Sequence, residues 1–275
     1  MEGSILQLKD IPEYLLQRIT GVLHAYSTAL IRLHVDENGR EQPLHIGAGT
    51  FVSIGDIDGI LTATHVVEKL ESKSMLGLLM KREGEIHSYK LPMSSLSVTS
   101  IGTRISDENG PDLSLIVFAN SENVSTIKAS KSFFPLLNDV TVVPETDQGI
   151  WFTCGTPEEY VTKENNPSGT GKIMSLHNIC GGGGPDREYM INDLDYYEFP
   201  IDVHAGVPKS FSGMSGGAVW QVTIKKGADG ILAPVKYYFS GVIYYENYRE
   251  DGTRILRSHG RKTIKKLCTI FQPSK

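Results

Sequence analysis

The segment 211–220, Phe-Ser-Gly-Met-Ser-Gly-Gly-Ala-Val-Trp, holds a serine between glycines and continues into an apolar run. Glycine lacks a Cβ, so Gly213 and Gly216 permit backbone angles and close approaches that other residues forbid. The hydroxyl of Ser215 and the neighbouring backbone N–H groups can therefore face one open space. Acyl transfer needs such an arrangement, because the attacking alkoxide and the oxyanion that it creates must be handled side by side. Taken alone, the segment also fits an ordinary tight turn.

A serine nucleophile requires a base, and the base requires a carboxylate that orients it. The segment 47–67 contains two apolar runs around the turn Asp-Ile-Asp-Gly, which predicts a hairpin that ends at His65. The segment 110–118, Gly-Pro-Asp-Leu-Ser-Leu-Ile-Val-Phe, places Asp112 at the start of an apolar strand. Each residue also has an ordinary interpretation, since a histidine often ends a strand and an aspartate after Gly-Pro often belongs to a turn.

Three segments in chain order carry a family resemblance: Thr-Ala-Thr-His (62–65), Asp-Leu-Ser-Leu (112–115) and Gly-Met-Ser-Gly-Gly (213–217). They resemble those of trypsin-like serine peptidases with the chymotrypsin fold, and are most similar to the disulfide-free bacterial and HtrA-type members. The resemblance extends over roughly residues 25–260, but only these segments are specific. The order His, Asp, Ser differs from the order in subtilisin-like enzymes and in α/β-hydrolases.

The resemblance implies a role for each residue of the three segments. His65 acts as general base and then as general acid, Asp112 fixes its tautomer, and Ser215 is the nucleophile that forms an acyl-enzyme. The oxyanion donors are the backbone N–H groups of Gly213 and Ser215. No metal and no organic cofactor is implied. His204 lies nearer to Ser215 in sequence than His65 does, but no motif of the family surrounds it.

Short apolar runs separated by Gly, Asn and Asp turns predict an all-β fold, with strands that include 75–80, 85–91, 96–101, 113–119 and 189–201. Leu15, Ile19, Val22 and Leu23 recur at helical spacing and predict a short N-terminal helix. The resemblance implies a chymotrypsin-like double β-barrel with a short N-terminal helix and a C-terminal helix. We expect an N-terminal helical extension (1–24), a first β-barrel with His65 and Asp112 (25–125), an inter-barrel connection and second β-barrel with Ser215 (126–258), and a C-terminal helix (259–275). The polar segment 120–148 lacks sustained periodicity, so we place the inter-barrel connection there. The glycine run 181–184 lacks the residues of a phosphate loop and is expected to be a surface turn.

Composition limits the partners and the compartment. The chain has 275 residues, 40% of them hydrophobic, which is enough for two small β-domains or one large domain. A net charge of −5 gives no broad basic field, so we expect neither nucleic acid nor membrane as a partner. No apolar run is long enough to span a membrane, and the first residues do not have the pattern of a secretory signal.

The number and spacing of the cysteines indicate a reducing compartment. Cys154, Cys180 and Cys268 are odd in number and widely spaced. A secreted peptidase of this kind would usually carry paired cysteines. We therefore expect a cytoplasmic protein with free thiols and no metal site, because metal binding needs closer clustering of ligands.

The expected substrate pocket departs from the familiar patterns. Counting back from the nucleophile, the position at the pocket base in trypsin-like enzymes falls on Lys209, so cleavage after Lys or Arg is not predicted. Ser212 lies beside the oxyanion glycine. In the strand 241–246, Tyr244 and Tyr245 are expected to flank the pocket, and Glu246 replaces a common glycine at its entrance. Lys209 then favours an acidic side chain in the substrate, pairs with Glu246, or is an ordinary exposed lysine.

The sequence predicts an intracellular serine endopeptidase that acts on protein or peptide substrates. Methionine occupies position 214, where digestive relatives carry the aspartate that binds a newly cut N-terminus, so we expect the uncleaved chain to be competent. A regulatory protein partner could act through the N-terminal helix. The alternative is a pseudoenzyme-like module on the same fold that binds a polypeptide by backbone pairing.

Overall fold

The first described element is a helix whose apolar residues recur every fourth position. The computed structural model describes residues 11–82, 85–101, 110–136, 144–165, 172–176, 179–202 and 207–271. Helix α1 (Glu13–Tyr26) buries Leu15, Ile19 and Leu23 on one face, as the helical spacing predicts. Pro12 precedes the helix and suits this position because its missing N–H would have no partner in the first turn. The chain passes directly from α1 into the first strand.

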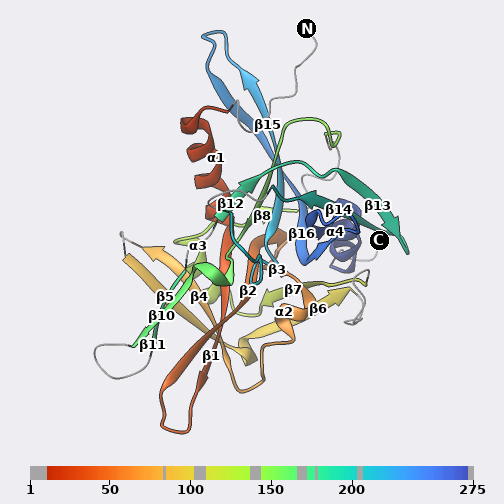
Figure 1. The fold of residues 1–275 in the computed structure, drawn as a ribbon. Helices are drawn as coiled ribbons and strands as arrows, with labels where there is room; N and C mark the ends of the chain where they lie inside the picture. The colour runs from red at the N-terminus through yellow and green to blue at the C-terminus, as the bar shows by residue number, and fades with distance from the viewer. Residues whose placement is uncertain are drawn as a thin grey trace.

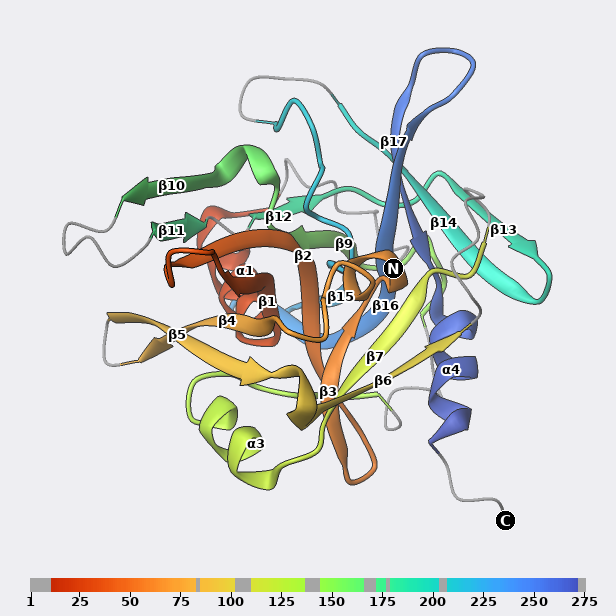
Figure 2. The same cartoon turned by 90° about the horizontal axis from the view of Figure 1, so that it is seen from below.

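The N-terminal half forms one curled sheet in which neighbouring strands are antiparallel, with the exception of a short parallel strand (Figures 1 and 2). The strand order is β5-β4-β1-β2-β3-β7-β6, and β8 pairs with β2. Its strands are β1 (Ser27–Val35), β2 (Glu41–Ile54), β3 (Ile57–Thr62), β4 (Met75–Arg82), β5 (Glu85–Pro92), β6 (Leu96–Ile101), β7 (Leu113–Phe118) and β8 (Phe134–Pro135). Short helices follow three of these strands: α2 (Thr64–Val67), the 3-10 turn η2 (Met93–Ser95) and α3 (Ser121–Lys128).

The C-terminal half forms a second antiparallel sheet with the order β12-β9-β15-β16-β17-β14-β13. Its strands are β9 (Ile150–Gly155), β12 (Ile179–Gly182), β13 (Arg187–Ile191), β14 (Leu194–Pro200), β15 (Ala218–Lys226), β16 (Leu232–Tyr248) and β17 (Arg254–His259). The remaining elements are the 3-10 turn η3 (Glu158–Tyr160), the hairpin of β10 (Val161–Asn165) and β11 (Lys172–Leu176), and helix α4 (Arg261–Ile270). The prediction of an all-β fold of two barrel-like sheets with a helix near each end is confirmed.

The main core joins the two sheets. The fully buried Trp220 of the second sheet packs edge-on against Phe134 of the first, with the ring centroids 4.9 Å apart, and against Phe239 at 5.0 Å. The buried faces of α1 and α4 belong to the same cluster. Because interiors are close-packed and resist deformation, this shared core fixes the relative position of the loops that the two sheets carry.

The segment 120–148, where we expected the inter-barrel connection, contains helix α3, which Asn120 caps by accepting the N–H of Glu122 at 2.7 Å. Two local predictions differ from the structure. The glycine run is not a free turn, since Gly181 lies in β12 opposite Thr153 of β9. The expected single strand 189–201 is a hairpin of β13 and β14, in which Asn192 and Asp193 take positive φ angles of 50° and 63°, as two-residue hairpin loops require.

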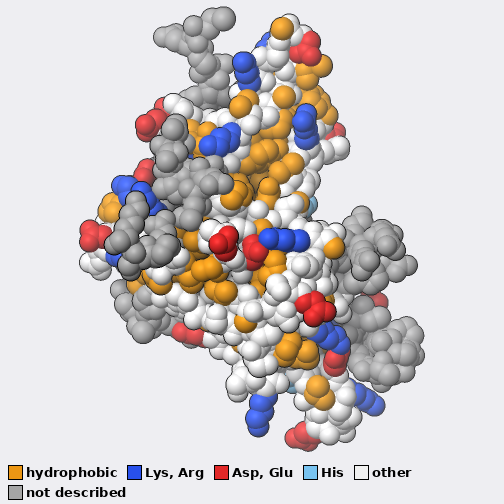
Figure 3. Space-filling model, turned by 180° about the vertical axis from the view of Figure 1, so that it is seen from behind, with side chains coloured by type: hydrophobic (Ala, Val, Ile, Leu, Met, Phe, Trp, Pro, Cys, Tyr) orange, Lys and Arg blue, Asp and Glu red, His pale blue; other side chains and the backbone are white. Residues whose placement is uncertain are grey.

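The outer face of α1 meets the projecting β15–β16 hairpin. The hydroxyl of Tyr14 bonds to both the carbonyl and the N–H of Leu232 at 3.2 Å. Tyr14, Ile231 and Val235 are exposed at this end of the molecule. Figure 3 shows hydrophobic side chains gathered over the upper part of one face, toward the end where this hairpin projects in Figure 1. Among the described helices, none has the length and apolarity needed to cross a membrane.

Candidate active site

The pairing of β3 with β7 brings His65 and Asp112 together. Thr62 at the end of β3 lies opposite Ser114 near the start of β7. The residues that follow β3 therefore lie next to the residues that precede β7. His65 follows β3 in the short helix α2, and Asp112 directly precedes β7. The hydroxyls of Thr64 and Ser114 are 2.8 Å apart and bridge the two segments. Residues 47 positions apart in sequence thus meet at one end of the β3–β7 pair.

His65 and Asp112 make two hydrogen bonds. The ring Nδ1 of His65 lies 2.6 Å from Oδ2 of Asp112, and the backbone N–H of His65 donates to Oδ1 at 2.9 Å. Burial alone raises the pKa of Asp112, but the hydrogen bonds and charge of His65 outweigh burial and lower this pKa overall. An ionised carboxylate at Nδ1 fixes the ring proton there and leaves Nε2 free to act as a base. His204, the other histidine considered as a base, lies outside the described residues.

The nucleophile loop of the second sheet rests on the elements that carry His65. The carbonyl of Ser215 accepts the N–H of Ala48 in β2 at 2.8 Å. A Cβ on Gly47 would lie 2.6 Å from Val66 and 2.8 Å from the carbonyl oxygen of Ser215, so only glycine fits there. Within the described chain, the hydroxyl of Ser215 makes no hydrogen bond to His65. Such bonds are often long before substrate binds and tighten in the complex.

The peptide between Ser212 and Gly213 is oriented by the second sheet. The carbonyl of Ser212 accepts the N–H of Glu158 at 2.6 Å. A trans peptide directs its C=O and N–H to opposite sides, so the N–H of Gly213 faces away from Glu158. Gly213 has a φ of 89°, and a Cβ there would lie 2.9 Å from the carbonyl oxygen of Thr156. Neither Gly213 nor Ser215 donates its N–H to a described residue, so both remain available to an oxyanion.

Apolar packing orders the residue before the nucleophile. Met214 is fully buried and belongs to a cluster that includes Phe211, Val219 and Ile243. A Cβ on Gly155 would lie 3.2 Å from two side-chain atoms of Met214, so β9 and this side chain are in close contact. The loop is therefore held by buried apolar surface, which contributes stability without a charged partner.

A histidine of the second sheet holds the backbone of Asp112. The N–H of Asp112 donates to Nε2 of His259 at 3.0 Å. His259 is fully buried and stacks on Tyr244, with ring centroids 4.4 Å apart and an interplanar angle of 20°. Burial lowers the pKa of His259 to about 4, so the ring is neutral near pH 7 and carries its proton on Nδ1. No pattern in the sequence indicates this contact, because 147 positions separate the two residues.

The residues expected around the pocket take different positions. Tyr244 is buried and stacks on His259, whereas Tyr245 is 38% exposed. Lys209 is exposed, and its backbone N–H donates to the Glu159 carboxylate at 2.7 Å. Ser212 is also exposed and donates its hydroxyl to Glu158 at 3.2 Å.

Glu246 forms its ion pair with a residue that the sequence did not indicate. Its carboxylate accepts Nε of Arg254 at 2.5 Å and the backbone N–H of Phe211 at 2.8 Å. Arg254 is buried, donates to the carbonyl of Pro208 at 2.9 Å, and lies over the Phe211 ring at 4.7 Å from its centroid. Among the described residues Lys209 makes no ion pair with Glu246. The loop before the nucleophile is thus tied to β16 and β17 through Arg254.

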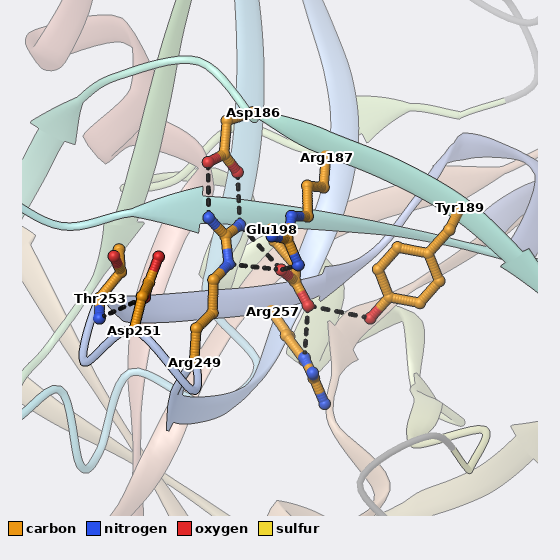
Figure 4. Close-up of polar contacts among 8 residues, drawn as sticks. All are labelled: Asp186, Arg187, Tyr189, Glu198, Arg249, Asp251, Thr253 and Arg257. Atoms are coloured by element: carbon orange, nitrogen blue, oxygen red, sulfur yellow. Dashed lines mark hydrogen bonds and ion pairs between the residues drawn. The ribbon is translucent and has the colours of Figure 1, made fainter.

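A second ion-pair network holds the strands next to His259 (Figure 4). Glu198 of β14 is 3% exposed and accepts hydrogen bonds from Arg249 and Arg257. Arg249 also binds both oxygens of Asp186, at 2.7 and 2.6 Å. Glu198 and Arg257 are cross-strand partners in the β14–β17 pair, two residues before the pair that contains His259. A buried, multiply bonded carboxylate of this kind fixes the register of that pair.

Comparisons with known proteins add little to this geometry. No protein-family model matches the sequence. No curated protein matches it either. A solved structure described as "Aromatic interactions drive the coupled folding and binding of the intrinsically disordered Sesbania mosaic virus VPg protein" is similar at 16% identity, over 91% of this chain and 92% of that chain, with a TM-score of 0.43. A likeness at this level carries no argument about function, so the site is interpreted from its own residues.

Proposed function

We propose that this chain is an intracellular serine endopeptidase of the trypsin-like kind that its sequence resembles. One observation carries the proposal: His65 is bound to Asp112 through both its ring and its backbone, and the loop with Ser215 rests on the strand and helix beside His65. His65 and Asp112 lie beside strands of the first sheet and Ser215 in a loop of the second, and the Ser215 carbonyl accepts the N–H of Ala48 in β2. A general base, an orienting carboxylate and a serine are the groups that acyl transfer requires.

The proposed reaction proceeds through an acyl-enzyme. Nε2 of His65 takes the proton of Ser215 as Oγ attacks the substrate carbonyl, and Asp112 stabilises the resulting imidazolium. The N–H groups of Gly213 and Ser215 receive the oxyanion, and one such donor is typically worth about 3–4 kcal/mol of barrier. His65 then protonates the leaving amine. A water molecule activated by the same ring hydrolyses the ester and restores the hydroxyl of Ser215.

We propose that substrates with a basic residue before the scissile bond are not preferred. The buried guanidinium of Arg254 lies beside Phe211 and Pro208, in the loop that would line the pocket. Glu246 is already paired with Arg254, so a basic substrate side chain entering the pocket would find no free carboxylate there. It would also be repelled by the guanidinium of Arg254. A peptide-library profile dominated by cleavage after Lys or Arg would contradict this specificity.

We propose that the uncleaved chain is competent. Met214 is held by apolar packing, so the loop does not depend on a new N-terminal ammonium. The three free cysteines suit a cytoplasmic location. A regulatory partner at α1 would meet the surface around Tyr14, because Leu15, Ile19 and Leu23 are committed to the core.

The alternative is a module that binds polypeptides without cleaving them. The N–H groups of Gly213 and Ser215, which no described residue accepts, favour the enzyme, since backbone pairing of a bound strand has no need of them. The test is incubation of full-length protein with a denatured protein substrate, with Ser215→Ala as the control and mass spectrometry of the products. New peptides with wild type alone support the peptidase. Substrate bound intact by both forms would support the binding module.

A further inference from the structure

Two of the free cysteines face each other across a strand pair, away from the triad. Cys180 of β12 is the direct antiparallel partner of Cys154 of β9. Gly183 donates its N–H to the Trp151 carbonyl at 3.1 Å in the same ladder. Hydrogen-bonded and non-hydrogen-bonded pairs alternate along such a ladder, so the cysteines, three steps away, form a non-hydrogen-bonded pair with Cα atoms about 4.5 Å apart. A disulfide spans about 4.4–6.8 Å between Cα atoms, so this pair can close without moving the backbone far.

The two thiols share one environment but differ in character. Cys154 is fully buried in the main core, and Cys180 is half-buried and packs on the same core. A hydrogen bond with Cys154 lowers the pKa of Cys180 against the effect of burial, and His24 at the end of α1 lowers it further. Burial raises the pKa of Cys154. Cys180 is therefore the nucleophilic thiolate, and Cys154 is the thiol that donates to it.

The third cysteine provides an internal reference. Cys268 is buried in α4, and burial raises its pKa to about 11. It belongs to the same core cluster, but it lacks the cross-strand thiol that faces Cys180. If Cys180 reacts with peroxide faster than Cys268, the difference is due to the facing thiol of Cys154 and the surroundings of this pair.

We propose that Cys180 and Cys154 form a redox-sensitive dithiol that a hydroperoxide converts into a cross-strand disulfide. The Cys180 thiolate attacks the terminal peroxide oxygen, the O–O bond breaks, and the leaving alkoxide or hydroxide takes up the proton that the Cys180 thiol released when it ionised. The product is a sulfenic acid. Cys154 then attacks this sulfur, the S–O bond breaks, and water leaves with the thiol proton of Cys154. Two electrons pass from the two sulfurs to the peroxide, and the net products are one disulfide, one alcohol or water, and one water.

This bond would close the segment 154–180, which includes the hairpin β10–β11 and η3. Glu158, whose N–H holds the Ser212 carbonyl, lies in that segment. The site is distinct from the triad and does not depend on the proposed peptidase activity.

The test uses full-length reduced protein treated with a small excess of hydrogen peroxide. We expect the intact mass to fall by two hydrogen atoms, the loss to reverse with dithiothreitol, and peptide mapping to find Cys154 linked to Cys180. The matched control Cys268→Ser should oxidise like wild type. Cys154→Ser should stop at a sulfenic acid on Cys180 that dimedone traps, and Cys180→Ser should lose the reaction.

Three results would overturn the proposal: no mass change at peroxide levels that oxidise a free cysteine peptide, modification of Cys268 as fast as of Cys180, or direct conversion of Cys180 to sulfinic acid without a link to Cys154. The peptide map of wild type decides between these outcomes even if the Cys154→Ser protein fails to fold.

Discussion

The contact between His259 and Asp112 makes a prediction that no motif in the sequence contains. His259→Leu removes the acceptor of the Asp112 N–H and leaves this part-buried donor without its partner. His259→Gln keeps an acceptor oxygen near the position of Nε2 and serves as the matched control. We expect His259→Leu to be labelled slowly by a serine-directed fluorophosphonate and His259→Gln to recover most of the wild-type labelling rate.

The magnitude follows from the cost of an unpaired donor. Leaving a buried polar group unsatisfied costs about 1–3 kcal/mol, and the part-buried N–H of Asp112 belongs in the lower half of that range. At about 1.4 kcal/mol per factor of ten, the reaction rate should fall about 5- to 30-fold if the cost is borne by the catalytic geometry. The reaction rate of Asp112→Asn should fall further, by about 10⁴-fold, because this change alters the tautomer of His65, whereas His259→Leu alters only the position of Asp112.

The assay is the second-order rate of labelling by a serine-directed fluorophosphonate at pH 8, with circular dichroism to confirm that each variant is folded. Folded His259→Leu protein that reacts at the wild-type rate would refute the positioning role. Equal losses in folded His259→Leu and His259→Gln proteins would refute the hydrogen bond as its cause.

Three further predictions concern stability and the oxyanion loop. Burial lowers the pKa of both His45, in β2, and His259 to about 4, so the unfolded chain binds more protons than the folded chain between pH 6.5 and pH 4. The free energy of unfolding should therefore fall as the pH falls from 6.5 to 4, by about 3 kcal/mol per histidine. Urea unfolding across this range tests this, and the free energy of unfolding of His45→Gln should depend less steeply on pH. Gly213→Ala should lower fluorophosphonate labelling by about 10²–10³-fold, because its Cβ would lie 2.7 Å from His45 and its φ is positive; unchanged labelling would argue against the assigned oxyanion donor. Glu246→Gln should destabilise the fold by about 3–5 kcal/mol because it leaves Arg254 buried without a partner, whereas the paired change with Arg254→Met should cost less in thermal unfolding.

The sequence predicted those features that local pattern determines. The strands 75–80, 85–91, 96–101 and 113–119 were expected from alternating apolar residues and turn chemistry, and the structure places β4 to β7 there. The helical spacing of Leu15, Ile19 and Leu23 likewise predicted α1. The structure also brings His65 and Asp112 into direct contact, as their motifs indicated.

Features that depend on contacts between distant segments were not predictable. Nothing near His259 marks it as the partner of Asp112, and nothing near Arg254 marks it as the cation that Glu246 binds. The glycine run became part of β12 because β9 offered an open edge, which composition cannot reveal. Cross-strand register, which places Cys180 opposite Cys154, is likewise a property of the folded sheet.

The most direct test of the proposed function is active-site titration of the intact chain. Full-length protein, with its N-terminus verified by mass spectrometry, is treated with the fluorophosphonate probe and compared with Ser215→Ala. We predict stoichiometric modification of wild type at Ser215, without prior trimming, and no modification of the variant. Absence of labelling in folded wild type, or equal labelling of both proteins, would contradict the assignment of Ser215 as the nucleophile.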